Sequence, residues 1–371
     1  MKALSFHQLA CALILAALGT FCSPALGAVG TVVAWGGSHQ NTPSGLSNIK
    51  AISTALDHSL GLRADGTVVA WGYNFNGQCN VPAGLNSVVD IAAGAFFSLA
   101  LKSDGTVVAW GDDQFEQCQV PPGVTGIKAI SAGRGHGLAL KSNGTVVAWG
   151  DNTYGQGDVP SGLNSVVAVF ARWNYSLALK SNGTVVAWGV NDAGQTDVPA
   201  GLSNVTALTG GIDYCLALKS DQTVVGWGNY PSLPASLSGV SALAAGDNHS
   251  LALAGDGTIA AWGGDETGQT DVPAGLGEVL ALGAAWNYSV ALVVGGLPGN
   301  PFPLTNPTFS SNGFSVSFPT QVGKIYRLEF KDSWADPNWS ALSPVTGDGG
   351  TMTLADTSAT GSQRFYRVRQ D

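Results

Sequence analysis

The dipeptide Trp-Gly recurs seven times through the chain, inside a string that hardly changes. Five copies of the string read GTVVAWG, and the other two read QTVVGWG and GTIAAWG. The intervals between consecutive copies are 36, 39, 39, 39, 39 and 35 residues. The tryptophans concerned are Trp35, Trp71, Trp110, Trp149, Trp188, Trp227 and Trp262. Such a period predicts a repeat architecture, in which each unit buries its apolar face against its neighbours.

A second string, typified by SLAL, also occurs seven times and alternates with the first. Asp-Gly or Asn-Gly joins most pairs, as at Asp104-Gly105, and supplies the positive φ angles of a tight hairpin turn. Asp221-Gln222 departs from this pattern, so we expect that hairpin to be less regular. Short strands of small apolar residues, in a chain with only 11% charged residues, indicate burial on both faces. The pattern predicts an all-β fold, a seven-bladed β-propeller over residues 29–294.

The order of the strings predicts how the ring closes. The first GTVVAWG, at residues 30–36, has no preceding hairpin partner, and the last apolar string, SVAL at 289–292, has no following one. We therefore expect Thr31–Trp35 to pair with Ser289–Val294, so that an N-terminal strand completes the last blade. The seven repeat tryptophans are expected to be core residues.

Residues 1–28 read as a signal peptide, with Lys2 ahead of the apolar stretch Leu9–Leu18 and small residues at the end. This predicts an exported protein, secreted or periplasmic, that does not insert into a membrane. Loss of Lys2 changes the formal net charge from −9 to −10. Because phosphate binding needs the opposite sign, we expect no nucleic-acid partner.

Three cysteines, Cys79, Cys118 and Cys215, remain after removal of the leader. An odd number cannot pair fully within one chain. They are interpreted as small buried or half-buried side chains, with a disulfide or a metal site as the alternative.

Composition changes at residues 295–303, which are rich in Gly and Pro and are expected to form a stiff linker. Alternating segments in residues 304–371 predict a small β-sandwich. This module resembles C-terminal β-modules of secreted bacterial proteins. Trp334 and Trp339 are expected in its core, with a glycan- or surface-binding role as the alternative.

The repeated strings resemble the regulator-of-chromosome-condensation repeat, whose units read G-x-V-x-x-WG-x-N-x-x-G-Q followed by A-x-G-x-x-H-S-L-A-L. VNDAGQTDVP at 190–199 and GDETGQTDVP at 264–273 look closest to the compact units of the secreted bacterial β-lactamase-inhibitor protein II type. The resemblance implies a propeller that works by binding another protein. In the inhibitor, aromatic and acidic residues of the variable loops contact the partner.

Two loops vary among the units, one just before SLAL and one just after AWG. Scaffold strands do not require Trp at only two of seven equivalent positions, so Trp173 and Trp286 are the first candidates for exposed binding anchors. Rigid aromatics among Asp and Asn are typical of a binding hot spot. The other candidates are Phe96, Asp213, Tyr73, Phe75, Phe115, Tyr154, Tyr230, Asp112 and Asp192.

The sequence contains no pattern that clearly predicts a catalytic site. Asp57-His58-Ser59 contains the residue types of a triad, but adjacent residues of one strand point to opposite faces. His58, His136 and His249 share a repeat position that Phe or Tyr fills in the other units, which indicates packing. We therefore expect a non-enzymatic, monomeric protein with no cofactor and no metal, which binds an unidentified protein and could act as an inhibitor. A lectin-like propeller that binds a glycan is the alternative, and a propeller lyase or hydrolase is the third reading.

Overall fold

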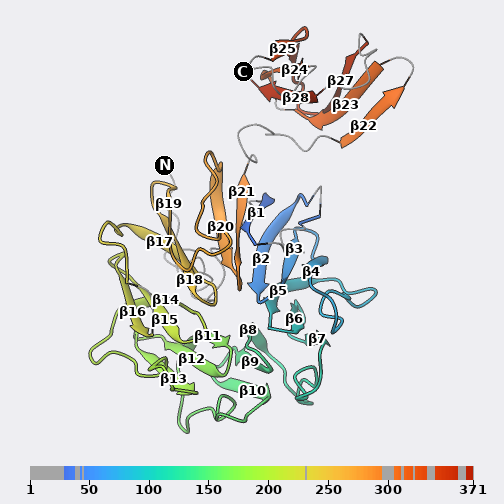
Figure 1. Ribbon diagram of the computed structural model, residues 1–371. Coiled ribbons are helices and arrows are strands. Elements are labelled where there is room, and N and C mark those ends of the chain that lie inside the picture. The colour runs from blue at the N-terminus through green and yellow to red at the C-terminus, as the bar shows by residue number, and fades with distance from the viewer. Residues whose placement is uncertain are drawn as a thin grey trace, which may run out of the picture. The chain divides into compact units, whose positions relative to one another are not determined.

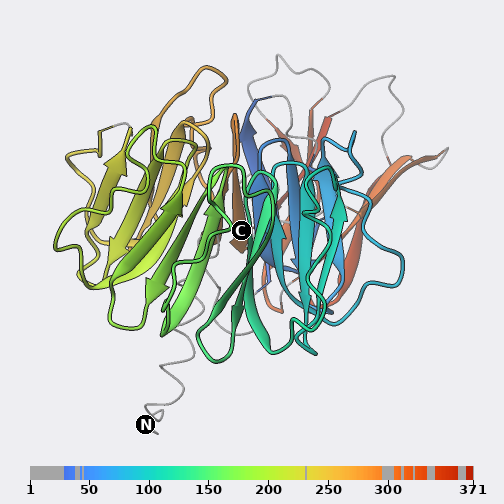
Figure 2. The same cartoon turned by 90° about the horizontal axis from the view of Figure 1, so that it is seen from below.

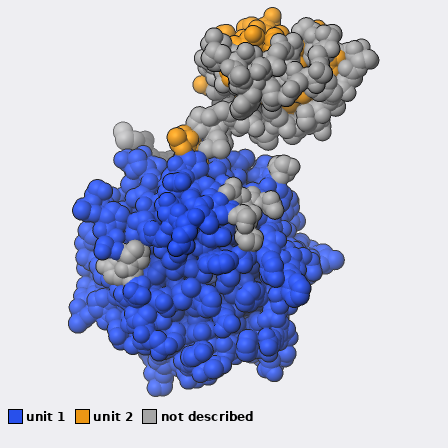
Figure 3. Space-filling view, viewed as in Figure 1, with its two compact units in different colours: residues 1–273, 279–294 blue, residues 274–278, 295–371 orange. Residues whose placement is uncertain are grey.

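The structure of the chain is a computed structural model, and its described residues are all in strands, turns and loops. It describes residues 29–370 except 38–41, 44–45, 230–231, 295–304, 311–312, 321, 332–338 and 358–364. The expected signal peptide, linker and Trp334 lie outside the described residues. The chain divides into two compact units, residues 1–273 with 279–294 and residues 274–278 with 295–371 (Figure 3).

Unit 1 is a ring of seven three-stranded antiparallel sheets, so the predicted seven-bladed propeller is confirmed (Figures 1 and 2). The inner strands are β2 (Ile49–Ala55), β5 (Val88–Ala93), β8 (Ile127–Ala132), β11 (Val166–Arg172), β14 (Val205–Gly210), β17 (Val240–Ala245) and β20 (Glu278–Ala284). The middle strands are β3 (His58–Arg63), β6 (Phe97–Lys102), β9 (His136–Lys141), β12 (Tyr175–Lys180), β15 (Tyr214–Lys219), β18 (His249–Ala254) and β21 (Tyr288–Val294). The outer strands are β4 (Val68–Gly72), β7 (Val107–Gly111), β10 (Val146–Gly150), β13 (Val185–Gly189), β16 (Val224–Gly228), β19 (Ile259–Gly263) and β1 (Thr31–Gly36).

The ring closes through its N-terminal strand, as the order of the strings predicts. β1 pairs antiparallel with β21, from Thr31 opposite Val293 to Gly36 opposite Tyr288. Just before β1, Gly30 bridges to Ile49 of the first inner strand. The last blade is therefore built from both ends of unit 1.

The repeat tryptophans are core residues, each at most 8% exposed. In five blades the indole N–H donates to the backbone carbonyl of a buried Gln in the preceding loop, as from Trp110 to Gln78 at 2.9 Å. The loop after Trp227 is shorter and has no such Gln, and the indole N–H of the next tryptophan, Trp262, has no hydrogen-bond partner. In these five blades the tryptophan thus joins its own blade to the loop of the neighbouring blade, whereas the indole N–H groups of Trp71 and Trp262 have no hydrogen-bond partner.

The hairpin at Asp221-Gln222 is as regular as the others, so the expectation that it would be less regular is wrong. Gln222 takes φ 66°, in the same left-handed region as Gly105 at φ 81°. The Asp221 carboxylate accepts hydrogen bonds from the Thr223 amide and hydroxyl, as Asp104 does from Thr106. This clamp holds the turn in shape although the glycine is missing.

Buried His and Tyr side chains join neighbouring blades at one shared repeat position. His58, His136 and His249 are fully buried, and each ring Nε2 lies 2.9–3.0 Å from a serine hydroxyl of the next blade. In the pair His58–Ser98 the serine donates its own proton to the Gln78 carbonyl, so the ring must donate from Nε2. In two other blades a tyrosine hydroxyl bonds a serine hydroxyl of the next blade instead, as Tyr288 does with Ser59 at 2.8 Å. The expected packing role of the histidines is confirmed.

These histidines are expected to make stability depend on pH. Burial lowers the pKa of His58 to about 3 and of His136 and His249 to about 4. Below pH 6.5 the unfolded chain binds protons that the folded chain does not, so stability falls as the pH drops from about 6.5 towards 4. Each unit of pKa separation corresponds to about 1.4 kcal/mol, so three groups together are expected to cost several kcal/mol. Urea unfolding at pH 7 and pH 4.5 measures this loss.

The triple variant His58→Tyr/His136→Tyr/His249→Tyr is the matched control, because tyrosine already fills this position in other blades. It is expected to lose much less stability over the same pH range. An equal loss in the wild type and the variant would mean that other groups cause the acid sensitivity.

The three cysteines are free. Cys215 is buried, whereas Cys79 and Cys118 are half-buried with their sulfur atoms against backbone carbonyls. Burial raises the pKa of Cys79 to about 11 and of Cys118 and Cys215 to about 12. The three thiols therefore act as small packing groups. This agrees with their interpretation from the sequence as small buried or half-buried side chains.

Unit 2 is a small β domain with two sheets. One sheet has the order β22 (Thr305–Ser310), β23 (Gly313–Pro319), β27 (Thr351–Asp356). The other contains β25 (Ser340–Ala341), β24 (Ile325–Lys331), β26 (Val345–Thr346) and β28 (Phe365–Gln370), which pairs with β24. Both sheets contribute to one apolar core that includes Phe318 and Tyr326. Trp339 is half-buried.

Candidate functional site

Both sets of variable loops lie at the same end of the propeller. Each inner strand turns into a middle strand there, and each outer strand ends there because it runs antiparallel to the middle strand. In all seven blades the first residues after the outer strand donate a backbone hydrogen bond to the turn before the middle strand. Examples are the Tyr73 amide to the Asp57 carbonyl at 2.7 Å and the Asp112 amide to the Phe96 carbonyl at 3.0 Å. We call this end the loop face, made of the turns 56–57, 95–96, 134–135, 173–174, 212–213, 247–248 and 286–287 and the loops 73–80, 112–119, 151–158, 190–197 and 264–271.

The loops after the outer strands are held rigidly. In five of them a buried Gln accepts a hydrogen bond through its side-chain oxygen from an amide two residues earlier, as Gln117 does from Phe115 at 2.7 Å. The same residue accepts the indole N–H of the next blade through its backbone carbonyl. Side chains on these loops are therefore presented on a fixed backbone, which lowers the entropy cost of binding.

Five aromatic candidates are exposed on the loop face. They are Tyr73 (41% exposed), Phe75 (85%), Phe115 (40%), Tyr154 (51%) and Trp286 (47%). The rings of Tyr73 and Phe75 stack with centroids 6.3 Å apart. Since large exposed apolar patches on soluble proteins often belong to interaction sites, these five side chains make the loop face the candidate interaction surface.

Trp173 is not an exposed anchor, in contrast to the expectation from sequence. It is half-buried near the propeller axis, at φ 39°. Its indole N–H donates to the Asp247 carboxylate at 3.2 Å, and the Arg134 guanidinium lies 5.5 Å from the centre of its ring. Neighbouring charged groups thus hold the indole in place.

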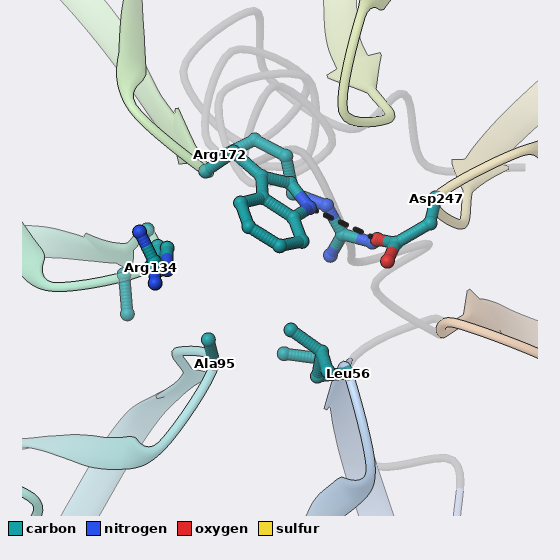
Figure 4. A pocket seen from close by; sticks show the side chains of 9 residues that line it. Leu56, Ala95, Arg134, Arg172 and Asp247 are labelled. Carbon is teal, nitrogen blue, oxygen red and sulfur yellow. Dashed lines mark hydrogen bonds and ion pairs between the residues drawn. The ribbon is translucent and has the colours of Figure 1, made fainter.

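A buried ion pair lies on one side of the axis, beside this tryptophan. Arg172, at the end of β11, donates from Nη2 to Asp247, in the turn after β17, at 2.9 Å (Figure 4). The two side chains are 9% and 4% exposed, and the inner strands that carry them belong to blades two positions apart. The pair therefore ties together blades that are not neighbours in the ring.

The hollow at the axis is small. Leu56, Ala95 and Arg134 line it opposite the ion pair (Figure 4). Its volume is about 10 Å³, roughly the space that one water molecule needs, whereas small-molecule sites measure about 300–1,000 Å³. This axial hollow is therefore too small to hold an ordinary small-molecule ligand.

The remaining candidates differ in their surroundings. Phe96 and Asp213 are half-buried, and Asp192 is exposed. Asp112 is half-buried and accepts hydrogen bonds from the side-chain amides of Gln117 at 2.7 Å and Asn76 at 3.3 Å, so it also shapes its own loop. Tyr230 lies outside the described residues.

Sequence reasoning missed Arg172. The equivalent residues of the other six units are all small: Ala55, Gly94, Gly133, Gly211, Gly246 and Ala285. An arginine at a position that is otherwise Gly or Ala was the available signal.

Among the described residues, no group of three or more His, Cys, Asp or Glu side chains is placed to hold a metal ion. The described part of the chain contains no helix that is long and apolar enough to cross a membrane.

Five segments of unit 1 match the regulator of chromosome condensation (RCC1) repeat. They are residues 49–78, 88–117, 127–156, 166–195 and 240–269. Each begins with an inner strand and ends at the buried Gln of the loop face. Two units have no match. One is the blade of β14, β15 and β16, whose following loop lacks this Gln, and the other is the closing blade of β20, β21 and β1, which combines both ends of unit 1. Unit 1 is thus an RCC1-repeat propeller.

Solved structures show the same fold. Prp20p from Saccharomyces cerevisiae is 20% identical with a TM-score of 0.59, over 73% of this chain and 92% of that chain. Human WBSCR16 is 17% identical with a TM-score of 0.55, over 65% and 86%. The ectodomain of the Physcomitrella patens receptor kinase CR4 is 23% identical with a TM-score of 0.53, over 64% and 74%. A comparison with curated protein sequences found no match.

Proposed function

We propose that this chain is an exported, non-enzymatic protein that binds another protein through the loop face. The observation that carries the proposal is the exposure of Trp286, Phe75, Tyr73, Phe115 and Tyr154 at one end of a rigid ring. Aromatic side chains bury much area at little entropy cost and dominate protein interfaces. Export is supported by the leader-like residues 1–28.

Two further observations favour a protein over a small ligand. The axial hollow holds too little space for a ligand, and the exposed aromatics come from separate loops across a broad surface. Among the similar folds, yeast Prp20p has been studied for its binding to Gsp1p and histones and has been solved in complex with Kap60. A glycan site would be expected to recur from blade to blade, whereas these loops differ in each blade.

Inhibition is the proposed consequence of binding. A broad partner surface covered by a rigid propeller would be closed to substrate. Resemblance to the β-lactamase-inhibitor type makes a panel of β-lactamases the first enzymes to assay with the mature chain.

Affinity capture from extracellular and periplasmic fractions, followed by affinity measurement with the identified partner, tests the proposal. The variant Trp286→Ala/Phe75→Ala is expected to weaken binding by roughly several hundredfold, since each hot-spot aromatic contributes about 2 kcal/mol. The control Val89→Ala removes an exposed apolar side chain near the start of β5, at the end of the propeller opposite the loop face, and should bind like the wild type. Full affinity of the aromatic variant, or capture of glycans alone on an array, would reject the proposal.

A further inference from the structure

We infer that the partner presents a basic patch beside an apolar one. One half of the loop face would bind the apolar patch, and the other half would bind the basic patch. This inference builds on the proposed protein-binding function and names the chemistry of the partner. It follows from the distribution of charge along the propeller axis and of aromatic side chains around it.

The two ends of the propeller differ in charge. At the end opposite the loop face, the middle strands finish with basic residues: Arg63, Lys102, Lys141, Lys180 and Lys219. Carboxylates of the hairpin turns offset them, and two pair directly, Lys102 with Asp104 at 3.2 Å and Lys219 with Asp221 at 2.9 Å. This end therefore has little net charge.

The loop face is strongly acidic. Its acidic side chains are Asp57, Asp112, Asp113, Glu116, Asp151, Asp158, Asp192, Asp197, Asp213, Asp247, Asp265, Glu266 and Asp271. Its basic residues are Arg134 and, at the end of β11, Arg172, and Arg172 is already paired with Asp247. The negative charge of the propeller is thus concentrated on the face that carries the exposed aromatics, and an electrostatically complementary partner must be positive.

The aromatics occupy one arc of the ring. Trp286 precedes β21 in the closing blade, and Tyr73 with Phe75 follows β4 in the next blade round the ring. Phe115 after β7 and Tyr154 after β10 continue the arc through two further blades. Among the described residues, the equivalent loops after β13 and β19 carry no exposed large hydrophobic side chain.

Most carboxylates that are free to bind lie in the opposite arc; Glu116, exposed in the loop after β7, is the exception within the aromatic arc. Asp192 follows β13, Asp213 precedes β15, and Glu266 follows β19. These three have no side-chain hydrogen bond, whereas Asp112 and Asp113, in the aromatic arc, are occupied by groups of their own loop. Free carboxylates accept strong charge-assisted hydrogen bonds from Lys and Arg. The geometry thus matches a partner with apolar and basic patches side by side.

A display library of small folded proteins with randomised surfaces provides a defined probe for the full chain. Clones selected on the wild type are expected to carry Lys or Arg beside apolar residues, and to lose affinity as salt rises. With Asp192→Asn/Asp213→Asn/Glu266→Gln they should bind about tenfold more weakly, because each exposed ion pair contributes up to about 1 kcal/mol. The salt dependence should also decrease.

The control Ser103→Lys/Ser181→Lys/Ser220→Lys changes the net charge equally at the opposite, exposed end, and should leave affinity unchanged. An equal loss in this control would overturn the inference, because overall charge would then explain binding. Clones that need Trp286 and Phe75 but have no excess of basic residues, and bind the carboxylate variant fully, would overturn the inference and leave the proposed function standing. Clones indifferent to both loop-face variants would reject the proposed function as well.

Discussion

Deletion of residues 29–36 is expected to lower the melting temperature by roughly 10 °C or more. The deletion removes β1, and with it six pairs of the ladder to β21. Trp35, only 5% exposed, is lost together with its hydrogen bond to the Gln269 carbonyl. Loss of a buried Trp side chain alone costs about 3–5 kcal/mol, and about 2–4 °C accompanies each kcal/mol in a domain of this size.

The strand must act by closing the ring and not merely by adding apolar area. Val32 and Ala34 pack in a cluster with Ile49 of the first inner strand and Leu292 of the last middle strand. Without β1, β21 of the last blade is left with an unpaired edge, and the seam to the first blade loses the packing of Val32 and Ala34. Deletion of residues 304–371 should have a much smaller effect on the melting of the propeller, because unit 2 has its own core.

A rearranged variant provides the matched control. Residues 30–36 are removed from the N-terminus and inserted after Val293 through a Ser-Asp turn, which copies the sequence between Lys102 and Gly105. This variant should regain most of the lost stability, since six blades already form the same hairpin. Melting followed by circular dichroism compares the variants, and equal melting temperatures of the deletion and the full chain would contradict closure by β1.

Arg172→Ala is expected to lower the free energy of unfolding by about 3–5 kcal/mol. The substitution leaves the Asp247 carboxylate buried without its cation, and a buried unpaired charge is costly to keep from water. Among the described residues, it also breaks the only side-chain ion pair that joins two different blades. Chemical unfolding at neutral pH measures the loss.

The double variant Arg172→Ala/Asp247→Ala separates a lost charge pair from a lost packing group. Other blades show that small side chains are accepted at both positions, as in Gly94 and Ala95. The double variant should therefore be more stable than Arg172→Ala alone. If the two single effects simply add, the pair does not act as one unit and our account of the axis is wrong.

Much of the fold could be predicted because the repeat is nearly perfect. The alternation of the two strings fixes the hairpins, and the unpartnered strings at 30–36 and 289–292 identify the closing strand. The prediction for the Asp221-Gln222 turn was wrong because it considered only the preference of glycine for a positive φ. The turn is also held by the hydrogen bonds that the Asp221 carboxylate accepts from the Thr223 amide and hydroxyl.

The site was only partly predictable. A comparison of units finds which loop residues vary, and so found Trp286 and Phe75. It does not show which way a side chain turns, and Trp173 turns towards Asp247, which lies 74 residues away in sequence. The partner of Arg172 could not be found from a period of 39 residues either, because the contact joins two blades that are not adjacent in the ring.

The central claim is that a protein partner binds the loop face and leaves the opposite end free. Amide hydrogen exchange of the full chain, with and without its captured partner, tests this most directly. We predict slower exchange in residues 73–80, 112–119, 151–158 and 285–287 when the partner is bound, and unchanged exchange in the hairpin turns at 64–67, 103–106 and 142–145. Slower exchange confined to those hairpin turns, with the loop face unaffected, would contradict the account.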